Sequence, residues 1–178
     1  SKGKWIVGKL EDIKDYKEVV KKTYEQGELF MYLGEEYPID ITVDKTNQYV
    51  TMKLTNRTLV IITNTEEKAI IRINMEKLYR RQTLKIVLER IDYYQKFFSV
   101  KPNNVRVKQQ KTRWGSCSSL KNLNFNWKLS MAKPSVIDYI VVHEMSHLIH
   151  LNHSREFWNL VESIMPNYRE EKEWLRYN

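Results

Sequence analysis

All four histidines of this chain fall within the twelve residues that end at His153. His143 and His147 stand four positions apart in an apolar stretch that begins at Pro134, and this pattern predicts a helix through about His150. Side chains four positions apart project from one helix face, one turn apart, so these two imidazoles can bind the same metal ion. The sequence therefore predicts a metal-binding face on this helix.

Two further residues complete a catalytic pattern around His143 and His147. Glu144 follows the first histidine directly, in the position from which the Glu of an H-E-x-x-H helix acts as general base. His153 comes six residues after His147, beyond a turn expected at Asn152, and can fold back as a third ligand. Three protein ligands and one open position define a catalytic zinc site. The alternative is a helix that merely contains core or surface histidines.

The ligand type narrows the choice of metal. Neutral imidazole favours Zn²⁺, whereas magnesium and calcium prefer oxygen ligands. We therefore expect one zinc ion per chain, with iron and nickel left open by ligand type alone.

Three more residues are candidates for contact with a substrate or an oxyanion. His150 lies near the same helix face as the predicted ligands, and a surface role is equally open to it. Arg113 and Trp114 lie in the basic segment 101–133, which belongs to the predicted catalytic half. The single cysteine, Cys117, excludes an internal disulfide and has no neighbour at metal-ligand spacing, so we expect a buried or loop residue without a nucleophilic role.

The net charge of +8 comes from a single segment. Residues 101–133 contain eight of the 30 basic residues and none of the 22 acidic ones, so the rest of the chain is balanced. Such a segment, interleaved with aromatic residues, suits an anionic partner such as a nucleic acid or a nucleotide. A strand-rich segment with solvated lysines is the alternative.

The remaining pattern predicts the order of the elements. Pro134 and Ser154 are expected in the first turn of one helix and at the N-cap of another, and Phe157 and Trp158 in the core. In the first half of the chain, we expect a helix over Glu11 to Gln26 and three antiparallel strands within 37–43, 50–54 and 59–63. A long helix is expected within Glu66 to Phe98, with an apolar stripe of Leu84, Val87, Leu88, Ile91, Tyr94 and Phe98. Strands at 105–108 and Leu123 to Leu129 around a loop at 115–119 should follow, and then helices from Pro134, over 155–165 and over 168–176.

Composition bounds the class of protein. With 42% hydrophobic and 29% charged residues, the 178-residue chain is neither a disordered tail nor a membrane protein. We expect one α+β domain over 1–178, in which a small antiparallel or mixed sheet packs against the histidine helix and the long preceding helix; 101–178 forms the catalytic half and 1–100 the remainder. One cysteine and no transmembrane run favour the cytoplasm. The start at Ser1 suggests that the N-terminus has been trimmed.

At this point the sequence resembles the YgjP-like metallopeptidase family, which is similar to the WLM and SprT-like zinc proteases. The motifs that carry the resemblance are Lys111-Thr112-Arg113-Trp114-Gly115-Ser116-Cys117-Ser118-Ser119, Asn122-Leu123-Asn124-Phe125-Asn126-Trp127, His143-Glu144-Met145-Ser146-His147 and Asn152-His153-Ser154-Arg155-Glu156-Phe157-Trp158. The resemblance implies a zincin-like fold, zinc ligands at His143, His147 and His153, and Glu144 as acid/base. Family members usually carry further strands before Trp5, so the beginning of the domain is expected to be missing.

Zinc-dependent peptide hydrolysis is the leading functional hypothesis, with an extended peptide added to the edge of the strand at Leu123 to Leu129. A second hypothesis keeps the zinc and makes the substrate a phosphoanhydride such as a nucleoside triphosphate, gripped by Lys111 and Arg113. A third is a nucleic-acid-associated protease or binding module, whose binding would weaken steeply with salt.

Overall fold

The computed structural model describes residues 22–48, 50–110 and 112–177, and they form an α+β fold. The elements, in chain order, are β1 (Leu29–Tyr32), β2 (Glu35–Val43), β3 (Thr51–Thr55), β4 (Thr58–Thr63), α2 (Lys68–Tyr94), a 3₁₀ turn (Gln95–Phe97), β5 (Asn104–Lys108), β6 (Gly115–Cys117), β7 (Asn122–Asn126), a second 3₁₀ turn (Trp127–Met131), α3 (Pro134–Ser146), α4 (Arg155–Ile164) and α5 (Tyr168–Tyr177). Within these described ranges no helix combines the length and the apolar character needed to cross a bilayer.

The first sheet has the order β1-β2-β4-β3, with β2 parallel to β4 and β3 antiparallel to it. The prediction of three antiparallel strands is therefore wrong in its pairing, and it missed β1. The alternation of apolar and polar residues identifies a strand, but the loops that connect the strands decide which strand lies next to it. Asn56 and Arg57 both have positive φ and form a tight two-residue turn that pairs β3 with β4. Leu33 and Gly34 do the same between β1 and β2.

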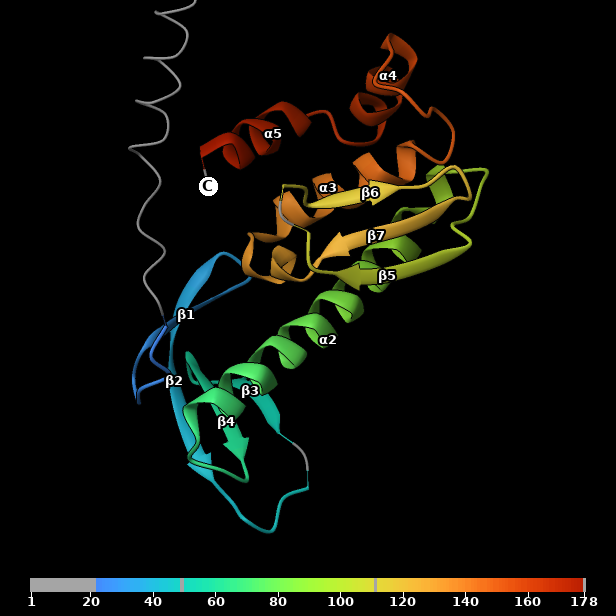
Figure 1. The fold of residues 1–178 in the computed structure, drawn as a ribbon. Coiled ribbons are helices and arrows are strands. Elements are labelled where there is room, and N and C mark those ends of the chain that lie inside the picture. The colour runs from blue at the N-terminus through green and yellow to red at the C-terminus, as the bar shows by residue number, and fades with distance from the viewer. Residues whose placement is uncertain (1–21, 49, 111, 178) are drawn as a thin grey trace, which may run out of the picture.

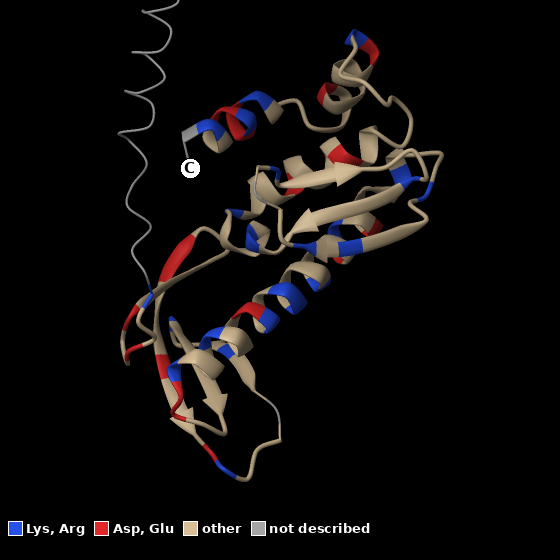
Figure 2. Ribbon diagram, viewed as in Figure 1, with Lys and Arg blue, Asp and Glu red and all other residues tan. Residues whose placement is uncertain are grey.

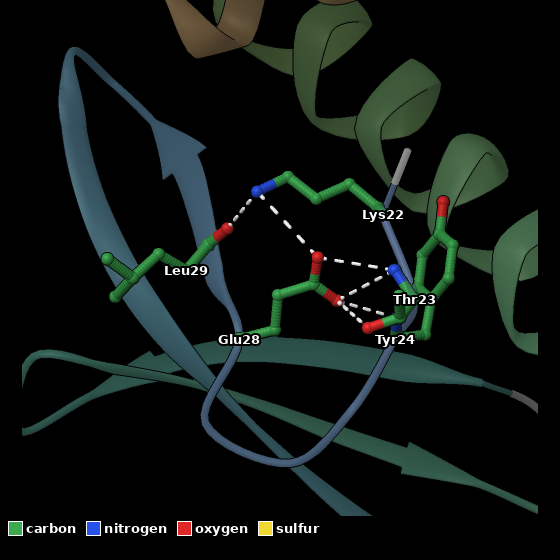
Figure 3. A network of polar contacts seen from close by, with 5 residues as sticks. All are labelled: Lys22, Thr23, Tyr24, Glu28 and Leu29. Carbon is green, nitrogen blue, oxygen red and sulfur yellow. Dashed lines mark hydrogen bonds and ion pairs between the residues drawn. The ribbon is translucent and has the colours of Figure 1, made fainter. Parts of the chain in front are cut away.

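The helix expected over Glu11 to Gln26 lies mostly outside the described residues, and residues 22–26 are not helical. Instead, a polar network holds the chain as it enters β1 (Figure 3). The Glu28 carboxylate accepts hydrogen bonds from the backbone N–H groups of Thr23, at 3.1 Å, and Tyr24, at 2.6 Å, while Lys22 Nζ donates to the Leu29 carbonyl. A turn closed by a side chain thus stands where a helix end was expected.

Helix α2 joins the two ends of the molecule (Figure 1). Its first half packs on the first sheet and its second half on the core around α3. Between the two halves, the buried Thr83 hydroxyl donates to the Trp127 carbonyl over 2.6 Å. The predicted long helix is confirmed, although Leu88 of its expected apolar stripe is 46% exposed. The buried residues of α2 are Ile71, Met75, Leu78, Tyr79, Thr83, Val87, Ile91 and Tyr94.

The second sheet has the order β5-β7-β6 and lies against α3. Residues 115–117 form β6, so the loop expected at 115–119 is wrong there. The strand expected to reach Leu129 ends at Asn126, whose side chain accepts from the Lys128 N–H and starts the second 3₁₀ turn. Because β7 is the central strand, it offers no free edge to a peptide, and the strand-addition site expected there is also wrong.

Helices α3, α4 and α5 build the rest of the C-terminal core (Figure 1). Pro134 stands in the first turn of α3 and Ser154 caps α4 by accepting from the Phe157 N–H, as predicted. A bidentate ion pair between Arg90 and Asp138 connects α2 to α3.

Candidate metal centre

The three histidines predicted as ligands come together. His153 Nε2 lies 3.0 Å from His143 Nε2 and 3.1 Å from His147 Nε2. Within the described part of the chain, these three residues are the one group of His, Cys, Asp or Glu side chains whose ligand atoms converge closely enough to share an ion. The sequence spacing therefore translates into a three-nitrogen cluster.

Local structure explains how residues ten positions apart meet. Helix α3 presents His143 and His147 on one face and ends at Ser146, four residues earlier than predicted. The chain then turns tightly, with the His150 N–H donating to the Ser146 carbonyl over 3.0 Å. This turn brings His153 back over the helix end, and the Ser154 cap starts α4 immediately afterwards.

A backbone group orients one of the three rings. His147 Nδ1 lies 2.9 Å from the His150 carbonyl oxygen, so Nδ1 carries the proton and donates, which leaves the Nε2 lone pair free for a metal. At the start of α4, the Ser154 hydroxyl and the Glu156 backbone and, more weakly, the charge of His150 lower the pKa of Glu156. The clearest contribution of His150 to the centre is thus its carbonyl.

Aromatic rings enclose the cluster. Phe157 is fully buried, and its ring centroid lies 5.0, 4.5 and 4.8 Å from those of His143, His147 and His153. Trp158 stacks on His153 at 5.5 Å with an interplanar angle of 20°. The expectation that Phe157 belongs to the core is confirmed. Trp158 is only half-buried, and sequence reasoning missed its contact with a predicted ligand, although its position one turn into α4 is a usable signal.

Glu144 is a buried carboxylate with little compensation. It is 5% exposed, and its Oε2 atom has no hydrogen-bond partner among the described residues. Burial raises the pKa of Glu144 to about 8, against the opposing charge of Arg113. A group with its pKa near neutrality is suited to accept and release protons at physiological pH.

Gly115 on β6 makes room for this carboxylate, a role that sequence reasoning missed. A Cβ atom at Gly115 would lie 2.7 Å from both Cγ and Oε1 of Glu144, closer than side-chain atoms approach one another. The backbone of β6 therefore lies directly against Glu144. The signal in the sequence is a glycine within an otherwise strand-like segment, which marks a close approach by another group.

The loop before β6 carries the other two candidates, Arg113 and Trp114, and Asn126 clips it in place. Asn126 Nδ2 donates to the carbonyl oxygens of Gln110, at 2.9 Å, and Arg113, at 3.1 Å. The backbone N–H of Asn126 donates to the carbonyl oxygen of Trp114, at 2.8 Å. Arg113 is exposed and within electrostatic reach of Glu144, whereas Trp114 packs against the core around α3.

Cys117 lies on β6 and is partly buried, without a place in the histidine cluster. Burial and the negative charge of Glu144 raise the pKa of Cys117 to about 11, so the thiol stays protonated near neutral pH. This fits the expectation of a residue without a nucleophilic role.

Two of the basic residues in 101–133 lie on the outer face of the second sheet. Leu123 and Phe125 of β7 are fully buried against the core, so the alternate positions face away from α3. Arg106 and Lys108 of β5 are exposed on this outer face, next to Asn124 and Asn126. Figure 2 shows blue and no red segments on this sheet. Arg106 and Lys108 thus lie on the face turned away from α3, whereas Arg113 is within electrostatic reach of Glu144.

Of three comparisons with known proteins, one identifies a family. No curated protein matches the chain significantly. Among solved structures, it is similar to the metallopeptidase zymogens abylysin of Pyrococcus abyssi (20% identity, TM-score 0.46, 50% of this chain and 90% of that chain) and jannalysin of Methanocaldococcus jannaschii (21%, 0.42, 52% and 92%). The model of the YgjP-like metallopeptidase domain matches residues 1–178, and the chain belongs to this family of metallopeptidases.

Proposed function

We propose that the protein is a zinc-dependent peptidase in which His143, His147 and His153 bind one zinc ion and Glu144 is the general base. The observation that carries the proposal is the convergence of three imidazole Nε2 atoms, 3.0 and 3.1 Å apart, beside a buried carboxylate. Membership of a metallopeptidase family supports the same conclusion.

The cluster fits zinc in both size and chemistry. Two nitrogens bound at 2.0–2.1 Å with a tetrahedral angle lie about 3.3 Å apart, close to the separations found here. Burial, followed by the nearby charges of His147, His153 and Lys172, lowers the pKa of His143 to about 3, so this ring is neutral and able to act as a ligand at physiological pH. When bound, zinc would supply a Lewis acid that polarises a carbonyl and makes water more acidic.

Glu144 would then move the proton. Its carboxylate accepts a proton from the attacking water and delivers it to the amine that leaves when the peptide bond breaks. The apolar setting of Glu144 favours this exchange, because burial raises its pKa to about 8 and so makes a proton easier to accept than it would be in water. The absence of a side chain at Gly115 leaves the space that the carboxylate occupies.

Among the described strands, β6 lies at one edge of the second sheet, and this edge is the natural place for an extended peptide. The hydrogen bonds Asn126 N–H to Trp114 O and Ser118 N–H to Asn122 O fix which residues of this segment bond to β7. Because bonded and non-bonded pairs alternate in an antiparallel ladder, the backbone N–H and C=O groups of Gly115 and Cys117 point outward. A substrate strand paired there would run beside Glu144.

Metal content and turnover together test the proposal. We expect one equivalent of zinc in the wild-type protein and in Glu144→Gln, and a large loss of zinc affinity in His153→Ala. His150→Ala is the matched control for zinc content, because a backbone carbonyl survives the substitution. Glu144→Gln should bind zinc but cleave no peptide. Full zinc affinity in His153→Ala, or cleavage by purified Glu144→Gln, would exclude the assigned roles.

The outer face of the second sheet supports an anionic partner as a second proposal. The exposed Arg106 and Lys108 are accompanied by the half-buried amide of Asn124, and no acidic residue occurs in 101–133. An amide can hydrogen-bond to a base edge, so a single-stranded nucleic acid suits this face better than a nucleotide substrate at the metal centre. Binding of an oligonucleotide should weaken as salt rises and should be reduced in the double variant Arg106→Gln/Lys108→Gln. Absence of binding at low salt would exclude it.

A further inference from the structure

Stacked rings connect the C-terminal helix to the metal centre. Tyr168, the first residue of α5, lies parallel to Trp158 at 5.3 Å, with an interplanar angle of 18°. Trp158 in turn stacks on His153 at 5.5 Å. Tyr168 also stacks on Tyr139 at 6.2 Å, and Tyr139 meets His143 edge-on at 5.7 Å. Two series of ring contacts, one through Trp158 to His153 and one through Tyr139 to His143, thus connect α5 to the proposed zinc ligands.

Lys172 lies on this path. Its Nζ atom is 4.1 Å from the centroid of the Trp158 ring, a cation–π contact that holds the flexible side chain over the indole. Because Trp158 stacks on His153, the ammonium group lies one aromatic ring away from a proposed zinc ligand.

Side chains of α5 alone line a shallow hollow of about 330 Å³ on its surface: Tyr168, Arg169, Lys172, Glu173 and Arg176. Arg169 and Arg176 also line it, but each has a carboxylate partner: Glu162 at 3.3 Å and Glu173 at 3.2 Å, respectively. Lys172 has no ion pair with any described residue. Among the described residues, the hollow therefore contains one positive charge without an ion-pair partner, and that charge lies over Trp158, which stacks on His153.

We propose that this hollow is a carboxylate-binding subsite for the peptide substrate, with Lys172 as its cation. An ammonium group with no internal carboxylate gains most from one supplied by a ligand, and hydrogen bonds between charged groups are stronger than neutral ones. The carboxylate belongs either to an Asp or Glu side chain or to the C-terminus of the peptide. The proposal rests on the peptidase function proposed above and defines its substrate class.

Peptide binding to the zinc-loaded Glu144→Gln protein tests the subsite without turnover. The probes are pairs of peptides that differ by Glu or Gln at one position, scanned along the sequence, and by a free or amidated C-terminus. We expect one carboxylate to tighten binding about 10-fold, and its position identifies the source. The quantity compared between variants is the ratio of the affinities for the two peptides of a pair, with and without the carboxylate. Adding Lys172→Met should bring this ratio close to one, and Lys172→Arg, which keeps the charge, should preserve it. Lys85→Met, which removes an exposed charge from α2, is the control and should leave the ratio intact.

The outcomes separate the two proposals. Equal affinity for all the paired peptides, or a preference that survives Lys172→Met, would overturn the subsite. Cleavage of the same peptides by the zinc-loaded wild-type protein is scored in parallel. A carboxylate preference in binding without any cleavage would uphold the subsite and exclude the peptidase, whereas cleavage without such a preference would do the reverse.

Discussion

Replacing Glu144 with Gln should stabilise the metal-free protein, and the gain should grow with pH. Glu144 is buried without a hydrogen-bond partner for Oε2 among the described residues, and burial raises its pKa to about 8 from an ordinary value of 4.5. Between these pH values the unfolded chain releases the proton while the folded chain keeps it. The folded state of the wild-type protein therefore loses stability as pH rises from 4.5 to 8. Glutamine carries no such proton.

The magnitude follows from the pKa difference. Each pH unit between 4.5 and the folded pKa contributes about 1.4 kcal/mol, so at pH 7 the gain in the free energy of unfolding is about 3 kcal/mol relative to acidic pH. Any cost of burying an amide in place of a carboxylic acid is the same at every pH. The predicted quantity is thus the difference in the free energy of unfolding between Glu144→Gln and wild type, and how this difference changes with pH.

Urea unfolding in the presence of a chelator, followed by tryptophan fluorescence from pH 4.5 to 8, measures this quantity. Glu171→Gln is the matched control: Glu171 is 7% exposed, but its carboxylate pairs with Lys133 over 2.8 Å. Removing the charge of Glu171 leaves the half-exposed Lys133 without its partner and should destabilise the protein slightly or not at all, with no gain that grows with pH. A Glu144→Gln difference that is constant or shrinks with pH would refute the view that Glu144 is an uncompensated buried carboxylate.

Three further predictions concern the surroundings of the cluster. Gly115→Ala should keep zinc binding but reduce kcat sharply in a peptidase assay, because the added Cβ would displace Glu144. Ser116→Ala is the control and should be active. Full activity of Gly115→Ala would contradict the close approach of β6 to Glu144. Phe157→Ala should lower the free energy of unfolding by about 3–5 kcal/mol in urea titrations and weaken zinc binding, and a loss below 1 kcal/mol would contradict its packing role. In metal-free Glu144→Gln, the free energy of unfolding should fall by about 2 kcal/mol from pH 8 to pH 5. The reason is that His143 takes up a proton below pH 6.5 in the unfolded chain but not in the folded chain, where its pKa is about 3. A free energy of unfolding that does not change over this pH range would contradict the prediction.

The three-histidine cluster was predictable because its geometry is local. The four-residue spacing of His143 and His147 fixes their common face, and a short turn suffices to return His153. Pro134 and Ser154 bounded the flanking helices for equally local reasons, since a first-turn proline and an N-cap serine act on neighbouring backbone groups. The resemblance to the YgjP-like family, read from the same region, is confirmed by the family model.

The errors arose where distant segments meet. The parallel pairing of β2 with β4 depends on which segments are adjacent in the fold, and alternation carries no such information. Strand β6 is three residues long and becomes a strand only through its pairing with β7. The roles of Gly115 and Lys172 likewise depend on contacts with Glu144 and Trp158, each made across separate elements.

The most direct test of the peptidase proposal is mass spectrometry of the products formed when zinc-loaded protein meets a mixture of unfolded protein and nucleoside triphosphates. Glu144→Gln, shown to carry zinc, is run in parallel. We predict new peptides from the wild-type protein, none from the variant, and intact nucleotides in both. Cleavage of the nucleotides alone, or peptides that appear equally with Glu144→Gln, would contradict a zinc peptidase that uses Glu144 as its base.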